Sequence, residues 1–288
     1  MGKILEKAVS PEVLNEAWKS VKNDRAIWHL GVSRADMEKD FVYHIAKLAK
    51  DLREGRYKPA PVRQFPVSRG DGKKRVISAL TLRDKLAQRA LLIVVTQLGE
   101  QIFHAESFGY RPGRTIDMAL SKAREYILCG LDWLVDADIS KFFDMIPCAP
   151  LIKIVKKTIP DKDAVCLIEK WIDVGSPRTG FLRKRRGVPQ GGVISPFLCN
   201  LYLTEFDQYL TNHNLPFVRF ADDFIIFTPS RAAAIAALKC AKDGLANLDL
   251  ELNIKKTRVA RSGPNVVFLG KKLPKPFKRG LPDPPSKR

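Results

Sequence analysis

The sequence predicts an α+β fold in which a small antiparallel sheet is backed by helices. Three observations favour this class. Residues 1–56 and 81–104 carry apolar side chains at three- and four-residue spacing, which is typical of helices. From residue 131 onward, short apolar strands alternate with helical stretches. One apolar run, VRFADDFIIF at 218–227, is interrupted by two adjacent aspartates where a strand–turn–strand unit is expected.

The first 130 residues are expected to form helices around one basic hairpin. Residues 57–68 contain three prolines and can only be extended or loop-like, because proline fixes φ and lacks an N–H donor. Residues 69–78, RGDGKKRVIS, combine a glycine-containing turn with a short β-branched strand, so a hairpin is predicted there. The helix at 81–104 then presents an apolar face formed by Leu86, Ala90, Ile93 and Leu98.

The second half is expected to hold the sheet. Its predicted elements are, in order, a buried strand at Trp133–Ile139, helices within 148–174, a helix after Pro196, the aspartate hairpin at 216–228, a helix at 230–248, and a strand pair of LELNIKKTRVA with NVVFLGKKL. The basic loop SPRTGFLRKRRGVPQGG precedes the helix after Pro196. The proline-rich basic end of the chain is expected to lie loose or to drape over a partner.

Composition bounds the class of protein. The 288 residues suffice for one large domain or two modest ones, and an apolar fraction of 45% favours a folded chain. No apolar stretch approaches the roughly 18–20 residues that span a bilayer, and the N-terminus lacks an apolar signal core. The five cysteines are scattered without a CxxC pair, which favours reduced thiols. We therefore expect a cytoplasmic protein with no membrane partner.

The charge balance points to a polyanion. Fifty Lys and Arg against 31 Asp and Glu leave a net charge of +19. An excess of this size usually means nucleic acid as the partner. A solvated basic surface and an acidic membrane face are the alternatives.

The adjacent aspartates Asp222 and Asp223 need compensation, because burying charge without a partner costs several kcal/mol. Phosphoryl transfer by two metals uses two or three carboxylates around Mg²⁺ ions about 3.5–4 Å apart. Asp138, at the end of LVDAD, is a candidate for the third carboxylate. Asp136 and Asp144 compete with it, and spacing alone does not choose. An ADD turn is also commonly structural, since aspartate suits turns.

At these residues the chain resembles a known family. LVDADISKFFDMI, RRGVPQGGVISPFLCNLYLTEFD and VRFADDFIIF resemble the ordered palm motifs of bacterial reverse transcriptases, nearest to those of group II introns and their relatives. REGRYKPAPVRQFPV, KKRVISALTLRDKLAQRAL, SFGYRPGRTIDMAL and LNIKKTRV follow the expected order. The resemblance implies polymerase fingers and palm, with a helical extension at 1–56, fingers at 57–130, a palm at 131–270 containing an insert at 148–186, and a basic tail at 271–288.

The resemblance also implies an RNA-directed DNA polymerase and names its carboxylates. Asp138 matches the first palm carboxylate, and Asp222 and Asp223 match the pair of the xADD turn. Together they would bind two Mg²⁺ ions, with Mn²⁺ as a substitute. The choice of Asp138 over Asp136 and Asp144 comes from the resemblance and not from spacing.

Five residues match positions that bind the incoming nucleotide. Phe143 matches the aromatic residue that stacks under the sugar and excludes a 2′-hydroxyl, which favours dNTP over rNTP; a core aromatic is the alternative. Arg75 matches the fingers arginine that grips the triphosphate, a role that suits a planar guanidinium. Gln190 and Gly191 match the loop that lines the nucleotide and the template base. Lys256 matches a lysine near the primer end or the triphosphate.

Six basic residues are assigned to nucleic acid by the same resemblance. Arg111 and Arg114 match a motif that shapes the template wall, with bracing of their own turn as the alternative. The flanks of the glutamine loop are expected to contact template phosphates, or else to be merely solvated; these are Arg183, Lys184, Arg185 and Arg186.

The family's helical thumb should follow the FLG motif, where only residues 271–288 remain. The expected partners are therefore an RNA template, a DNA product, and a dedicated noncoding RNA or a partner protein that supplies the thumb's grip. Such a form resembles reverse transcriptases of anti-phage defence or CRISPR-linked systems. Template-independent or protein-primed DNA synthesis, a group II intron retroelement protein, and a noncatalytic RNA-binding subunit are the alternatives.

Overall fold

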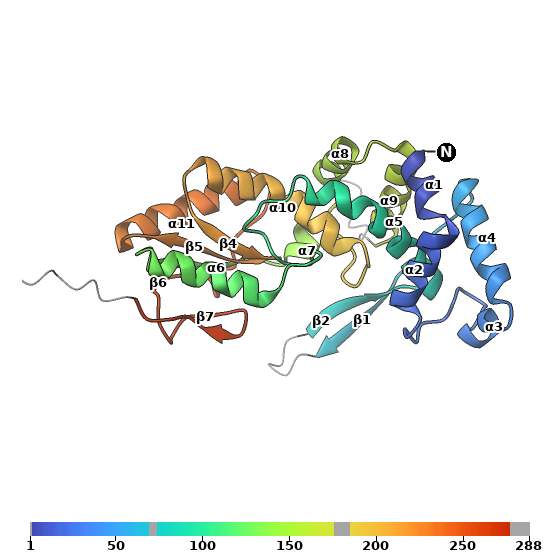
Figure 1. Ribbon diagram of the computed structural model, residues 1–288, viewed down its shortest axis with the longest axis horizontal. Coiled ribbons are helices and arrows are strands. Elements are labelled where there is room, and N and C mark those ends of the chain that lie inside the picture. Colours follow the sequence, from blue (N-terminus) through green and yellow to red (C-terminus); the bar gives the residue numbers. More distant parts are fainter. Residues whose placement is uncertain (1, 69–73, 176–184, 277–288) are drawn as a thin grey trace, which may run out of the picture. The chain divides into compact units, whose positions relative to one another are not determined.

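The computed structural model describes residues 2–68, 74–175 and 185–276 (Figure 1). It confirms the α+β class, since helices accompany a small antiparallel sheet. The chain divides into two compact units. Unit 1 comprises Met1–Phe103 and Lys141–Glu205, and unit 2 comprises His104–Ser140 and Phe206–Arg288. Within the described ranges, no helix combines the length and apolar character needed to cross a membrane.

Unit 1 is mainly helical. Its helices are α1 (Lys3–Ala8), α2 (Pro11–Val21), α3 (Arg34–Lys39), α4 (Phe41–Arg53), α5 (Leu82–Glu100), α7 (Phe142–Met145), α8 (Cys148–Thr158), α9 (Lys162–Gly175) and the first part of α10 (Ser195–Asn212). Several begin at a residue whose side chain accepts a bond from the first turn. Ser10 accepts from Val13 N at the start of α2, and Thr81 accepts from Asp84 N at the start of α5. Such caps satisfy amides that have no partner within the helix.

A buried polar network ties the proline-rich segment to two of these helices. Tyr57 donates to Asp84 Oδ1 at 2.5 Å, and the Ala60 amide donates to Asp84 Oδ2 at 2.9 Å. Trp171 Nε1 donates to the Tyr57 hydroxyl at 3.1 Å. Asp84 is buried, so these bonds replace the water that its carboxylate loses.

The predicted basic hairpin is present. Strands β1 (Arg63–Ser68) and β2 (Lys74–Ala79) pair antiparallel, with Val67 opposite Arg75. Residues 69–73, where the turn was predicted, lie outside the described residues.

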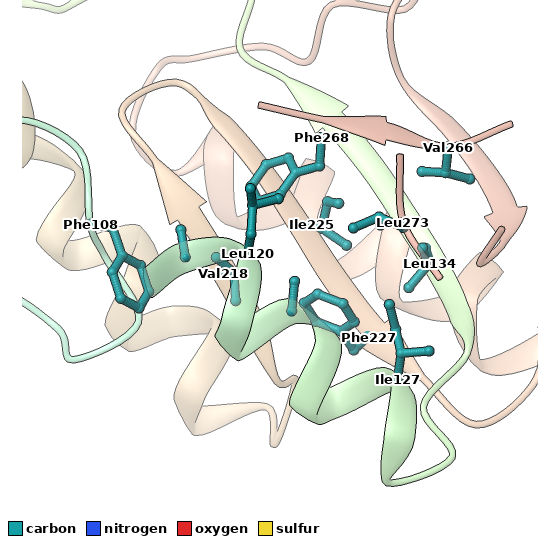
Figure 2. Packing of buried hydrophobic residues seen from close by; sticks show 12 residues of the cluster. Phe108, Leu120, Ile127, Leu134, Val218, Ile225, Phe227, Val266, Phe268 and Leu273 are labelled. Carbon is teal, nitrogen blue, oxygen red and sulfur yellow. The ribbon is translucent and has the colours of Figure 1, made fainter. Parts of the chain in front are cut away.

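Unit 2 holds a four-stranded antiparallel sheet in the order β4-β5-β3-β6. Its elements are α6 (Ile116–Leu128), the end of α10, α11 (Arg231–Ala246), β3 (Trp133–Asp138), β4 (Phe217–Phe220), β5 (Asp223–Thr228), β6 (Arg258–Arg261), β7 (Val267–Phe268) and β8 (Lys271–Lys272). Figure 2 shows the core in which α6 and the β7 segment meet the sheet, with Ile127, Leu134, Ile225, Phe227 and Phe268 packed together. Helix α11 packs against β3, β5 and β6.

The prediction for the last strands is wrong. The segments LELNIKKTRVA and NVVFLGKKL were expected to pair with each other, but β6 pairs with β3, and β7 pairs with β8. Leu269 and Gly270 have φ values of 49° and 79° and form a two-residue turn between β7 and β8. Positive φ at both turn positions favours a tight local hairpin. The backbone of β3 on this side is then hydrogen-bonded to β6.

Candidate active site

Three carboxylates meet at one end of the β3–β5 pair in unit 2. The antiparallel register places Asp138, the last residue of β3, directly opposite Asp223, the first residue of β5. Asp222 precedes Asp223 in the turn, and its carbonyl accepts from the Ile139 amide at 3.3 Å. Residues about eighty positions apart in the sequence are therefore neighbours on rigid backbone. Rigid strands are what a catalytic group needs to keep its spacing.

The neighbouring carboxylates perturb Asp223. The pKa of Asp223 is raised to about 6, because the group is partly withdrawn from water and lies beside the carboxylates of Asp222 and Asp138. The site thus concentrates negative charge at neutral pH. Such a cluster favours a cation.

A nearby turn supplies two partners to Asp138. Asn253 Nδ2 donates to Asp138 Oδ1 at 2.9 Å, and Lys256 Nζ donates to Asp138 Oδ2 at 2.5 Å. The Asn253 amide also donates to the Asp138 carbonyl at 2.8 Å. The bond to Asp138 raises the pKa of Lys256. Lys256, a predicted nucleotide-binding residue, is thereby brought to the carboxylates.

The two competing aspartates have other surroundings. Asp136 lies opposite Ile225, two positions back from the end of β3, and accepts from Arg258 Nε at 3.0 Å. Burial raises the pKa of Asp136. Asp144 belongs to unit 1, on α7. Of the two aspartates on β3, Asp138 lies directly opposite Asp223 and Asp136 does not.

The donor set suits a hard divalent cation, because Mg²⁺ prefers carboxylate oxygens together with water and phosphate. Among the described residues, no three or more His, Cys, Asp or Glu side chains form a ready-made metal cluster. Asp138 is instead neutralised by Lys256. The residues therefore fit a divalent cation by chemistry and register, in competition with an internal ammonium.

The predicted nucleotide-binding residues Phe143, Gln190 and Gly191 lie in unit 1, where α7 is hydrogen-bonded to the loop before Gln190. Phe143 is half-buried on α7, and its carbonyl accepts from the Val188 amide at 2.7 Å. Gln190 Nε2 donates to Asp144 Oδ1 at 2.9 Å. Gly191 has φ +103°, a region that favours glycine.

Strand β2, which carries Arg75, contacts this loop. The Ser78 amide donates to the Gln190 carbonyl at 2.7 Å. The structure therefore joins the backbone of the predicted triphosphate-binding strand to the glutamine loop.

Arg111 and Arg114, which are predicted to contact nucleic acid, bond to the backbone of their own loop. Arg111 is buried, and its Nη1 donates to the carbonyls of His104 and Ser107, both at 2.6 Å. Arg114 Nη1 donates to the Ala105 carbonyl at 3.1 Å, and its guanidinium lies over the Phe108 ring. This geometry favours the bracing alternative, because the bonds hold the shape of the arginines' own loop.

The basic flank of the glutamine loop is partly described. Arg185 Nη1 pairs with Asp173 Oδ1 at 2.6 Å, and Arg186 Nη1 donates to the Met145 carbonyl at 2.9 Å. Arg183 and Lys184 lie outside the described residues.

Sequence reasoning did not single out Asn253, Arg219 or Asp207. Arg219 and Asp207 form a fully buried ion pair, and Arg219 also donates to the carbonyl of Ala221 in the aspartate turn. The signal for Arg219 was available, since it stands inside the apolar run VRFADDFIIF, where a cation needs a buried partner. Nothing local in the sequence identifies Asn253.

Comparisons with known proteins show which family the chain is similar to. Residues 67–273 match the family model described as reverse transcriptase (RNA-dependent DNA polymerase). Protein YkfC of Escherichia coli K12 is 29% identical over 314 residues, covering 94% of this chain and 82% of YkfC. The group II intron-encoded protein LtrA of Lactococcus lactis subsp. cremoris is 34% identical over 177 residues, covering 61% of this chain but 29% of LtrA.

A solved structure of telomerase from Candida albicans, in complex with a fragment of telomeric RNA, is similar in fold, with a TM-score of 0.52 at 16% identity. The match covers 80% of this chain and 48% of the telomerase chain. The family model spans well over half of the present sequence. The chain therefore belongs to the reverse transcriptase (RNA-dependent DNA polymerase) family and is related to group II intron-encoded proteins.

Proposed function

We propose that this protein makes cDNA on an RNA template by two-metal nucleotidyl transfer, with Asp138, Asp222 and Asp223 as its catalytic carboxylates. The observation that carries the proposal is the register of β3 and β5, in which Asp138 lies opposite Asp223 beside Asp222. The raised pKa of Asp223 supports it, because perturbed carboxylates are typical of functional sites.

In the proposed reaction the primer 3′-oxygen attacks the α-phosphorus of a dNTP, and pyrophosphate leaves. Two Mg²⁺ ions, for which Mn²⁺ would substitute, would be held by the three carboxylates and would activate the hydroxyl and neutralise triphosphate charge. Lys256 adds a cation next to Asp138. Phe143 excludes a 2′-hydroxyl, Arg75 binds the triphosphate, and the Gln190 loop lines the base.

The proposed partners are an RNA template and its DNA product, supported by the net charge of +19. A dedicated noncoding RNA or a partner protein, a defence or CRISPR-linked setting, and a cytoplasmic location stay predictions. The 34% sequence identity to a group II intron-encoded protein favours a retroelement role as the second candidate function.

Incorporation of labelled dNTP on an RNA template with a DNA primer tests the proposal. Asp138→Asn and Asp222→Asn should each lower the rate by at least about 100-fold, the scale of losing one electrostatic contact to a transition state. Asp136→Asn is the matched control on the same strand and should stay within a few-fold of the unaltered protein. Full activity of Asp222→Asn would show that the site is assigned wrongly.

Two further arms separate the alternatives. Incorporation without added RNA would favour template-independent or protein-primed synthesis. RNA binding with no incorporation under any condition would favour a noncatalytic subunit. Sequencing the RNA that co-purifies with the protein distinguishes a dedicated noncoding RNA from a random pool.

A further inference from the structure

We infer that Arg219 is a positioning residue for the aspartate turn. Held by Asp207, it fixes the backbone of Ala221 and thereby aims the carboxylates of Asp222 and Asp223. The inference rests on the proposed function, because it concerns the geometry of the same carboxylates. It adds two buried residues that would act through the backbone of the turn.

The anchor is a buried two-point ion pair. Arg219 Nε donates to Asp207 Oδ1 at 2.7 Å, and Arg219 Nη2 donates to Asp207 Oδ2 at 2.5 Å. The side chains are 0% and 1% exposed. Asp207 lies on α10, so the guanidinium is held by a helix and not by another loop. A planar fork bound at two points has a defined direction.

The third arm of the guanidinium reaches the turn. Arg219 Nη1 donates to the Ala221 carbonyl at 3.0 Å. Ala221 has φ +59°, a left-handed conformation that L-residues with a side chain rarely adopt. Such conformations persist when the surroundings over-determine them, and they gather at functional sites. Ala221 immediately precedes Asp222, so its backbone sets the direction of the carboxylate pair.

A loop holds the same turn from another side. The Arg219 amide donates to the Glu106 carbonyl, and the Phe108 amide donates to the Arg219 carbonyl, both at 2.9 Å. A Cβ added at Gly109 would lie 2.5 Å from the Ala221 amide nitrogen. Backbone of the loop therefore lies directly against the turn, and only glycine permits this approach.

The pair supplies geometry more than charge. Asp207 neutralises the guanidinium within the core, so the carboxylate cluster gains little net positive potential from Arg219. Replacing a buried ion pair with apolar residues of similar volume is often neutral for stability. Loss of function and loss of folding can therefore be separated experimentally.

The test is the double variant Arg219→Met/Asp207→Leu in the full-length protein. The maximal rate of single-nucleotide incorporation should fall on the order of 100-fold, the effect of a misplaced catalytic group. At saturating Mg²⁺, the KM for dNTP and the dissociation constant for the primer–template should stay within about threefold, since neither substituted residue is assigned to dNTP or primer–template binding. Mn²⁺ binding, followed by electron paramagnetic resonance without substrate, should weaken several-fold.

Arg219→Lys keeps the buried charge but loses the planar guanidinium that bonds at several points. It should therefore also lower the incorporation rate while leaving the KM for dNTP nearly unchanged. It also serves if the double variant fails to fold. Gly109→Ala should act in the same direction by displacing the turn. Gly55→Asn is its control, because the space there is open and asparagine tolerates a φ of +69°.

The outcomes are distinct. An unaltered protein that incorporates no dNTP defeats the proposed function itself. An active unaltered protein, with folded Arg219 variants that keep both the incorporation rate and Mn²⁺ affinity, overturns the positioning role. The positioning role is also overturned if the melting temperature, the incorporation rate and the affinities for dNTP, primer–template and Mn²⁺ all fall together. That pattern is the signature of a merely structural pair.

Discussion

Lys256 Nζ lies 2.5 Å from Asp138 Oδ2, so the first carboxylate of the candidate site is neutralised by a side chain of its own unit. The ammonium is half-exposed, whereas the carboxylate is largely buried. A divalent cation that binds Asp138 must compete with this ammonium for the same oxygen. We therefore expect Lys256 to oppose metal binding at Asp138.

Lys256→Met should tighten divalent metal binding. Partly exposed ion pairs contribute up to about 1 kcal/mol, so the dissociation constant for Mn²⁺ should fall by up to about fivefold. Electron paramagnetic resonance of free Mn²⁺ measures this directly. Lys255→Met, an exposed neighbour, is the control and should leave the constant unchanged. Unchanged affinity in Lys256→Met would mean that the pair does not oppose the metal.

The stability of the metal-free protein should depend on Asp223. Its pKa of about 6 lies above the ordinary value of 3.8, so the folded state binds more protons than the unfolded state between these values. The stabilisation from this group is present at low pH and is lost as pH rises through about 6. Asp223→Asn stays neutral and should melt at a higher temperature than the unaltered protein above pH 6.

Melting temperatures measured in chelator between pH 4.5 and 8 check this prediction. The difference between the two proteins should shrink as pH falls below about 6. Asp117→Asn, which changes an exposed carboxyl on α6, should show no such pattern. A constant offset at every pH would contradict the raised pKa.

Phe143→Ala should relax the choice of sugar. Removing the ring opens room for a 2′-hydroxyl, so the ratio of kcat/KM for rNTP to that for dNTP should rise by about tenfold or more. Single-nucleotide incorporation measures both constants. Phe142→Leu is the matched control, because that ring is buried beside Phe143 and belongs to the core. An unchanged ratio would assign Phe143 to packing alone.

Asp84→Ala should destabilise unit 1. The substitution leaves the buried Tyr57 hydroxyl and the Ala60 amide without their acceptor, at a cost of about 3 kcal/mol in the free energy of unfolding. Urea unfolding measures this change. Glu16→Ala, at an exposed position on α2, should stay within about 0.5 kcal/mol. Equal effects of the two substitutions would show that the network adds little.

Local patterns account for what sequence reasoning predicted correctly. The helical spacing within 81–104 appears as α5, and RGDGKKRVIS contributes β2 to an antiparallel pair. Proline, glycine and side-chain period act over a few residues, so they can be read along the chain. Pairing of the final strands was predicted wrongly because the partner of β6 is β3, more than a hundred residues earlier.

By itself the sequence determined the α+β class, the basic character of the protein and, through ordered motifs, its family and its three candidate carboxylates. Only the tertiary structure decided which groups lie next to these carboxylates and which hold their turn in place. The strand register places Asp138 opposite Asp223, Lys256 bonds to Asp138, and Asp207 holds Arg219. Each of these contacts joins residues from different parts of the chain. Such partners follow from strand pairing and helix packing, because a charged side chain carries no local signal of the group it will meet once buried.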